Sequence, residues 1–93
     1  MRIIWTPAAA QDRADIWDYL HSVNPRAAIE MDNRFSESVS RLSLHPECGP
    51  AGTISGTREL IPHQSYRLVY QLDQGTAWIL ALVHTSRQWP LEK

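Results

Sequence analysis

The sequence contains little cysteine, and it has no long apolar segment. Its single cysteine, Cys48, cannot form an internal disulfide, and no spacing typical of a zinc site is present. Such a chain is expected in a reducing cytoplasm. No apolar run approaches the roughly 18 residues of a membrane span. Residues 1–5 become polar too soon for a signal peptide. We therefore expect a cytoplasmic protein that makes no membrane contact.

The chain also lacks a basic excess. Nine Lys and Arg residues stand against ten Asp and Glu residues, which gives a net charge of −1. A dedicated nucleic-acid binder usually carries a clear positive excess. The only lysine is Lys93, so the cations are almost all Arg. Arg binds planar anions through a bidentate fork, although a GC-rich genome explains the same composition. Residues 51–93 have a net positive charge, whereas residues 1–50 have a net negative charge, so we expect any anion site in the second half.

The first half of the chain predicts two helices within a single domain spanning residues 1–93. Thr6-Pro7 and Asn24-Pro25 each combine a capping side chain with proline at the first helical position. We expect helices over about 7–22 and 25–44, joined by so short a turn that they run antiparallel. The expected core positions recur at helical spacing and are Ala9, Ile16, Leu20 and Val23 in the first helix, and Ala28, Met31, Phe35, Val39 and Leu42 in the second.

After Gly52 the apolar period changes to that of strands. We expect strands over 57–61, 66–72 and 77–83, besides an N-terminal strand over 2–5. Gly75 permits a tight turn between the last two strands. Strand 77–83 is apolar on both faces, which predicts a central position. The order β-α-α-β-β-β predicts an α+β domain, with an antiparallel helical hairpin packed on an antiparallel-rich sheet.

The strongest candidate site lies where the last strand ends. His84, Arg87 and Trp89 follow it within six residues, and strand ends commonly present functional side chains. Arg67 alternates with the apolar residues of its own strand, so we expect it on an exposed sheet face. Alternative interpretations remain open: His84 bonds a loop carbonyl, Trp89 covers the core edge, and Arg58 and Arg67 pair with nearby acids.

The other polar residues form no recognisable catalytic constellation. Serines lack the strand-to-helix context of a nucleophile elbow, and the four histidines lack metal-ligand spacing. Asp12, Asp15 and Asp18 are interpreted as one solvated helix face. No Gly-rich phosphate loop is present. We therefore expect neither a metal ion nor a cofactor.

In this order and spacing, several short motifs resemble the RelE/ParE superfamily of toxins. They are Trp5-Thr6-Pro7-Ala8-Ala9 with Asp12, Tyr19-Leu20, Asn24-Pro25, Gly56-Thr57-Arg58-Glu59-Leu60, Tyr66-Arg67-Leu68-Val69-Tyr70, and His84 with Arg87-Gln88-Trp89-Pro90. The resemblance implies a RelE/ParE-like fold. It also implies the toxin of a bacterial type II toxin–antitoxin system, with a cognate antitoxin as its partner in a hetero-oligomer.

The two branches of this superfamily differ in chemistry. RelE-like members are ribosome-dependent ribonucleases that cleave mRNA with Arg and Lys side chains and commonly a late Tyr. On that alternative the ribosome and mRNA are partners, and the catalytic candidates are Arg58, Arg67, His84 and Arg87. A late Tyr has no counterpart between Arg87 and Lys93, and Leu60 replaces an expected Lys. Arg cannot readily transfer protons at neutral pH.

ParE-like members have a similar fold but lack that catalytic set, and they poison DNA gyrase. The Asn-Pro helix junction, the Gly-Thr-Arg-Glu-Leu strand and the Arg-Gln-Trp-Pro ending resemble this branch more closely. The resemblance then implies target binding through Arg67, His84, Arg87 and Trp89, with DNA gyrase as the target. Whether the chain is an enzyme depends on the branch. A non-toxic binding module is a further alternative, which a growth assay distinguishes from both toxins.

Overall fold

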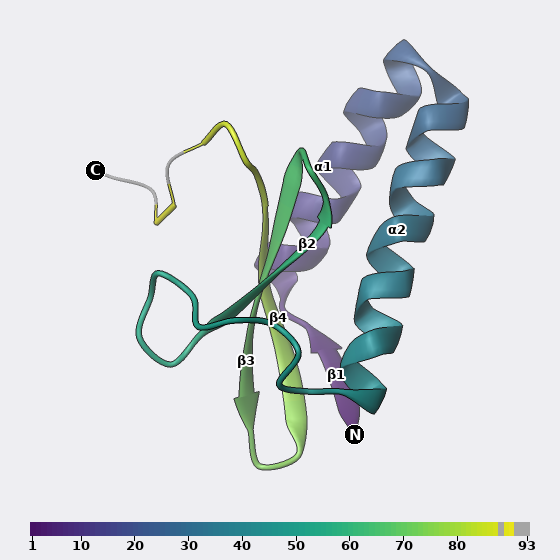
Figure 1. The fold of residues 1–93 in the computed structure, drawn as a ribbon. Helices are drawn as coiled ribbons and strands as arrows, with labels where there is room; N and C mark the ends of the chain where they lie inside the picture. Colours follow the sequence, from purple (N-terminus) through teal and green to yellow (C-terminus); the bar gives the residue numbers. More distant parts are fainter. Residues whose placement is uncertain (88, 91–93) are drawn as a thin grey trace.

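A computed structural model describes residues 1–87, 89 and 90, so Gln88 and Lys93 lie outside the described residues. The elements are β1 (Arg2–Trp5), α1 (Pro7–Val23), α2 (Pro25–Leu44), β2 (Arg58–His63), β3 (Tyr66–Asp73) and β4 (Thr76–His84). The two helices form an antiparallel hairpin over one face of the sheet (Figure 1). The predicted α+β class and the element order are confirmed. Within the described part of the chain, no helix is long and apolar enough to cross a membrane.

The four strands form one sheet in the order β1-β4-β3-β2. β1 runs parallel to β4, whereas the β4–β3 and β3–β2 pairs are antiparallel. The two inner strands are therefore β3 and β4, which confirms the central position predicted for β4. β1 is short and pairs with β4 only from Thr76 to Ile79. Among the described residues, no strand continues this pairing along the distal half of β4, from Leu80 to His84.

The helix starts follow from their capping side chains. Thr6 Oγ1 accepts a hydrogen bond from the Ala9 backbone N–H at 3.2 Å, and Asn24 Oδ1 accepts one from that of Arg26 at 3.1 Å. Both caps were predicted, because each side chain satisfies an N–H that has no partner within the helix. Thr6 Oγ1 also donates to the Ile79 carbonyl at 2.9 Å. The same threonine thus starts α1 and anchors it beside β4.

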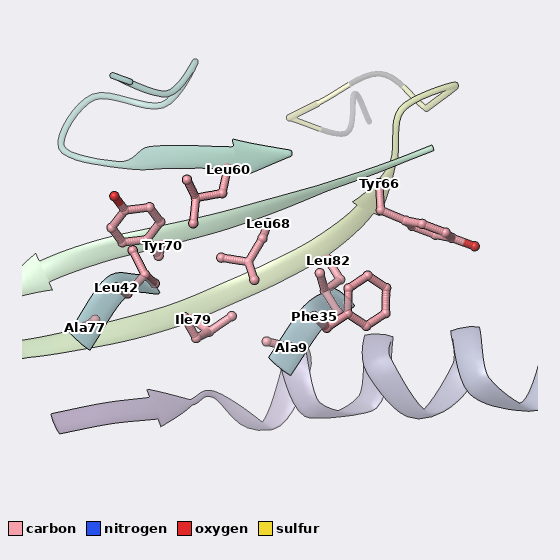
Figure 2. Close-up of a cluster of buried hydrophobic side chains, with 10 residues drawn as sticks. All are labelled: Ala9, Phe35, Leu42, Leu60, Tyr66, Leu68, Tyr70, Ala77, Ile79 and Leu82. Carbon is pink, nitrogen blue, oxygen red and sulfur yellow. The ribbon is translucent and has the colours of Figure 1, made fainter. Parts of the chain in front are cut away.

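The main core lies between the helices and the sheet. Figure 2 shows side chains from α1, α2 and the strands meeting there, and those of Phe35, Leu42 and Leu68 are almost fully buried. The predicted stripe of α2 is confirmed. The prediction for Val23 is wrong, since 70% of this residue is exposed. The tip of the hairpin projects past the sheet, so no core lies beneath it (Figure 1).

A second, smaller apolar cluster covers the opposite face of the sheet. It contains Val69, Ala81 and Val83, and Leu80 and Trp89 pack against it. The segment after β4 lies on this side, away from the helices (Figure 1). The expectation that this face is exposed is therefore wrong at Val69, which is fully buried. Because this face is apolar, packing of Trp89 from the segment after β4 removes part of it from water.

Candidate functional site

A groove of about 540 Å³ lies between α1 and the distal half of β4. We call it the α1–β4 groove. Its lining residues are Asp12, Asp15, Ile16 and Tyr19 of α1, Tyr66 of β3, residues 81–84 of β4, and Ser86, Arg87 and Trp89. The groove therefore contains three of the residues that the sequence singles out, His84, Arg87 and Trp89.

A larger concavity of about 740 Å³ lies at the opposite end of the sheet. Met1, Leu44, Cys48 and the turn at Gly75 line it, and none of the predicted site residues does. A functional site is expected where polar side chains converge, and not merely where the surface is most hollow. The α1–β4 groove is therefore the stronger candidate.

The floor of the α1–β4 groove begins at an irregularity in β4. Val69 pairs with Ala81, but the next residue of β3, Tyr70, pairs with Ile79, so Leu80 is the extra residue of a β-bulge. Here the chain of β1 has already turned into α1 at Pro7. The bulge thus lies where β4 passes from the edge covered by β1 to an edge that faces α1.

Asp12 joins α1 to this edge. Its Oδ2 accepts a hydrogen bond from the Leu82 backbone N–H at 3.1 Å. The interpretation of Asp12 as part of a solvated helix face is therefore wrong. Burial raises the pKa of this carboxyl, and the charge of Asp15 adds to the rise, while the Leu82 N–H and the charge of Arg87 oppose it. The Leu82 N–H and Arg87 thus offset only part of the cost of keeping the Asp12 carboxylate ionised in the groove.

Tyr66 and His84 close the distal end of the groove. The two rings meet edge to face, with their centroids 5.2 Å apart. Figure 2 shows Tyr66 at the margin of the core, with its hydroxyl turned away from the other buried side chains. Burial raises the pKa of Tyr66, and the nearby Tyr19 hydroxyl adds to the rise. The groove therefore ends in two neighbouring phenols and an imidazole.

The turn after β4 fixes the ring of His84. The Ser86 backbone N–H donates to His84 Nδ1 at 3.1 Å, and Ser86 Oγ lies 2.6 Å from the same nitrogen. The interpretation that His84 bonds a loop carbonyl is thus wrong for Nδ1. Since a backbone N–H can only donate, Nδ1 carries a lone pair here, and Nε2 holds the proton of the neutral ring. The Arg87 N–H donates to the His84 carbonyl at 2.9 Å, which tightens the turn.

Arg67 lies outside the groove, on the other face of the sheet. Its Nη1 forms an ion pair with Glu59 Oε1 at 3.3 Å, and both side chains are largely buried. The alternative interpretation, pairing with a nearby acid, is confirmed for Arg67. The expectation of an exposed position is wrong, because β2 places Glu59 beside Val69, next to Arg67 on the same face. Arg67 does not line the α1–β4 groove.

Arg58 lies on the helix-facing side of β2, close to the loop that follows α2. Its Nη1 donates to the carbonyls of Glu47 and Gly49 at 3.1 Å and 2.7 Å. The interpretation that Arg58 pairs with a nearby acid is therefore wrong: among the described residues its cation binds main-chain oxygens and forms no ion pair. The four catalytic candidates thus separate into three places: Arg58 at the loop, Arg67 on Glu59, and His84 with Arg87 in the groove.

Trp89 borders the groove and also packs on the second apolar cluster. It is only partly exposed and contacts the group formed by Val69, Ala81 and Val83. The interpretation of Trp89 as a cover of apolar surface is therefore confirmed. Its Nε1 is buried without a hydrogen-bond partner among the described residues. Replacement of Trp89 by Ala should consequently weaken the fold as well as any binding role.

Sequence reasoning missed the α1 side of the groove. Asp12, Asp15 and Tyr19 are separated by three and four residues, which places them on neighbouring positions of one helix face. That spacing was visible, but it does not show that the face lies beside a strand edge. Within the described ranges 1–87 and 89–90, no three His, Cys, Asp or Glu side chains cluster as metal ligands.

The sequence model of the family described as "ParE toxin of type II toxin-antitoxin system, parDE" matches residues 3–89. A curated relative from Caulobacter vibrioides, named Toxin RelE2, is 30% identical over 86 residues. That match covers 92% of this chain and 97% of the relative.

Two solved structures share the fold at lower identity. One, titled as the chromosomal ParDE TA system from P. aeruginosa, gives a TM-score of 0.79 at 22% identity, with 90% of this chain and 95% of that chain covered. The YoeB/ParE toxin from Agrobacterium tumefaciens gives a TM-score of 0.63 at 15% identity, with 90% and 98% covered. These likenesses confirm the predicted RelE/ParE-like fold.

Proposed function

We propose that this chain, which belongs to the ParE toxin family of type II toxin–antitoxin systems, arrests growth by inhibiting DNA gyrase. A cognate antitoxin neutralises it in a toxin–antitoxin hetero-oligomer, and both act in the cytoplasm. The names of the related proteins include both ParE and RelE. The choice of target therefore depends on the chemistry of the candidate site.

The observation that carries the proposal is the dispersal of the candidate catalytic residues. A nuclease that cleaves RNA without a metal needs its cationic and proton-transferring groups around one phosphate. Here Arg58 holds loop carbonyls and Arg67 pairs with Glu59, so neither cation reaches the α1–β4 groove. Only His84 and Arg87 remain together. This arrangement favours a toxin that acts by binding.

The hydrogen bonding of His84 supports the same choice. A general base needs a free lone pair within reach of the proton that it removes. The lone pair of His84 Nδ1 already accepts from the Ser86 N–H. The remaining nitrogen, Nε2, carries the proton and can only donate while the ring is neutral. His84 is therefore suited to holding a partner by a hydrogen bond, and poorly suited to abstracting a proton.

The charge of the groove also disfavours a phosphate ligand. Asp12 and Asp15 line it opposite Arg87, so two carboxylates face one guanidinium. Binding to ribosome-bound RNA gains from many phosphate contacts, whereas this chain has a net charge of −1. A protein partner such as gyrase supplies both signs of charge. We propose that His84 and Arg87 contact the target directly, and that Trp89 shapes the margin of that surface.

Expression of the chain in growing cells tests this proposal. Inhibition of gyrase should produce filamentation and DNA-damage signalling before protein synthesis falls. The matched control is the same chain with its antitoxin co-expressed, which should grow normally. An immediate stop in protein synthesis without DNA-damage signalling contradicts the proposal. Growth without any defect would make the chain a non-toxic binding module.

One observation favours a second candidate function, RelE-like cleavage of mRNA on the ribosome. The relative named Toxin RelE2 is 30% identical over nearly the whole chain. On this alternative, mRNA is cleaved in the ribosomal A site, and Arg67→Ala abolishes the cleavage. Such a result requires Arg67 to leave Glu59 when it binds the ribosome.

A further inference from the structure

We infer that the α1–β4 groove binds an extended segment of the antitoxin that carries a basic side chain, held by Asp12 and Asp15. This inference rests on the proposed function, because it takes the antitoxin as the partner. It adds the form of the bound segment, the charge that it carries and the toxin residues that select it. Three independent features of the groove support it: a strand edge that no other strand among the described residues covers, an excess of carboxylates, and phenol rings at one end.

The first feature is the direction of the β4 backbone groups. The Thr85 N–H donates to the Ser65 carbonyl at 2.8 Å, which fixes the phase of the β3–β4 ladder. By alternation, Leu82 and His84 direct their N–H and C=O groups away from β3 and toward the groove. The Leu82 N–H is indeed bonded to Asp12 on α1. The His84 carbonyl accepts from the Arg87 N–H at 2.9 Å, so it also has a partner. The Leu82 carbonyl and the His84 N–H are left to pair with an extended segment, as strand-adding partners require.

The second feature is the charge on the α1 wall. Asp12 is buried enough that its pKa rises, and Asp15 lies near enough to raise it further. One oxygen of Asp12 accepts from Leu82, and one oxygen of Asp15 accepts from Gln11 at 2.8 Å. Each carboxylate thus keeps an oxygen for another donor. Arg87 opposes only part of this negative charge, so a cation from the partner would stabilise both groups.

The third feature is the aromatic end of the groove. Tyr19 is 66% exposed, and its hydroxyl lies near that of the buried Tyr66. The apolar stem of a Lys or Arg packs on such rings while its cation reaches the carboxylates. A phosphate or an acidic side chain would instead be repelled by Asp12 and Asp15. The groove therefore selects a basic residue on the bound segment.

The test measures the affinity of the antitoxin, taken as the protein that abolishes toxicity when co-expressed with this chain. Asp15→Asn removes an exposed charge and Asp12→Asn keeps an acceptor for the Leu82 N–H, so both variants should fold. Each should weaken binding about 10-fold at low salt, as loss of a close interfacial charge pair does, and the difference should shrink at high salt. Asp18→Asn is the matched control. It lies on the same helix outside the groove lining, and it should change affinity less than about twofold.

Hydrogen exchange on the complex locates the bound segment. Amide exchange at Leu82 and His84 should slow when the antitoxin binds, because the N–H groups of these two residues face the groove and its backbone would cover them. The inference is overturned if Asp12→Asn and Asp15→Asn bind as tightly as Asp18→Asn, or if exchange at these amides is unchanged in a complex that forms. Either result leaves the proposed function intact. Absence of any neutralising antitoxin for an actively toxic chain overturns the inference together with the toxin–antitoxin assignment of its partner.

Discussion

The two ends of the sheet use polar side chains in opposite ways. Near the β3–β4 turn, Tyr70 is fully buried, and its hydroxyl donates to the Pro46 carbonyl at 2.8 Å and accepts from the Gly49 N–H at 3.0 Å. Arg58 donates to the Gly49 carbonyl in the same loop. At the distal end, Tyr66 lines the α1–β4 groove, and its hydroxyl points away from the other labelled core side chains (Figure 2). One end is closed on itself, whereas the other presents its polar groups outward.

This difference separates structural from functional roles for residues of the same type. Arg58 and Tyr70 bind main-chain atoms of the loop that follows α2, so replacing either residue should lower the free energy of unfolding. Arg87 and Tyr66 line an open groove, so replacing either residue should weaken the binding of a partner protein. Residue type alone does not distinguish these pairs. We expect substitutions at the closed end to lower the free energy of unfolding more than substitutions in the groove do.

Gly49→Ala should have the largest effect. A Cβ at Gly49 would lie 2.8 Å from both the Glu59 carbonyl oxygen and the Tyr70 ring. We expect the unfolding free energy to fall by about 3 kcal/mol, as overpacking of a closed site does. Urea denaturation followed by circular dichroism measures it. Gly75→Ala is the control, since only its positive φ of 78° is strained and nothing lies near the added carbon. Equal effects of the two variants would show that the loop is not tightly closed.

Tyr70→Phe should have the next largest effect. The change removes both hydrogen bonds of the buried hydroxyl and leaves the Pro46 carbonyl and the Gly49 N–H without that partner. We expect a loss of about 2 kcal/mol. Tyr66→Phe is the matched control at the open end, and its unfolding free energy should change by less than about 0.5 kcal/mol. A larger loss for Tyr66→Phe than for Tyr70→Phe would reverse the comparison.

Asp12→Asn should have a small effect that depends on pH. Burial raises the folded-state pKa of Asp12 above its ordinary value. Its contribution to stability is therefore fully present below the unfolded pKa and is lost as the pH rises through the folded pKa. The variant should thus gain stability relative to the wild type as the pH rises over that range, and the gain should persist at neutral pH. Denaturation at several pH values measures this, with the exposed Asp18→Asn as the control. A gain that appears only at acid pH would contradict the assigned cause.

Arg87→Ala should leave stability almost unchanged and still reduce toxicity. Its side chain lines the groove and is exposed, so we expect the unfolding free energy to stay within about 0.5 kcal/mol of the wild type. Growth after induction should recover by about tenfold in viable count, as loss of one close contact to the target allows. Arg34→Ala, an exposed change on α2, should remain fully toxic. Undiminished toxicity of Arg87→Ala would remove this residue from the target-binding surface.

The helices and strands could be predicted from the sequence because local signals determine them. Thr6 and Asn24 cap the helices through atoms two or three residues away, and Gly75 permits the last turn through its own backbone. The apolar stripe of α2 likewise predicts its buried face. Each of these features depends on neighbours in sequence, so periodicity and turn chemistry are sufficient to place it.

The site was only half predictable, because its other half depends on contacts between distant residues. His84 and Arg87 follow a strand end, which the sequence shows. Asp12 contacts Leu82, 70 residues away, through a main-chain N–H that the β-bulge at Leu80 leaves facing α1. Arg67 was predicted to be exposed because periodicity gives the face of a strand. Periodicity does not show that the neighbouring strand, β2, places Glu59 beside Arg67.

We propose that this chain acts by binding gyrase and that its separated arginines do not form a nuclease centre. The most direct measurement incubates the purified chain with gyrase and relaxed DNA, and in parallel with translating ribosomes, with Arg87→Ala as a control in both reactions. We expect loss of supercoiling with accumulation of cleaved DNA, both weakened by Arg87→Ala, and intact mRNA. Undisturbed supercoiling, together with A-site cleavage of mRNA that Arg67→Ala abolishes, would contradict it.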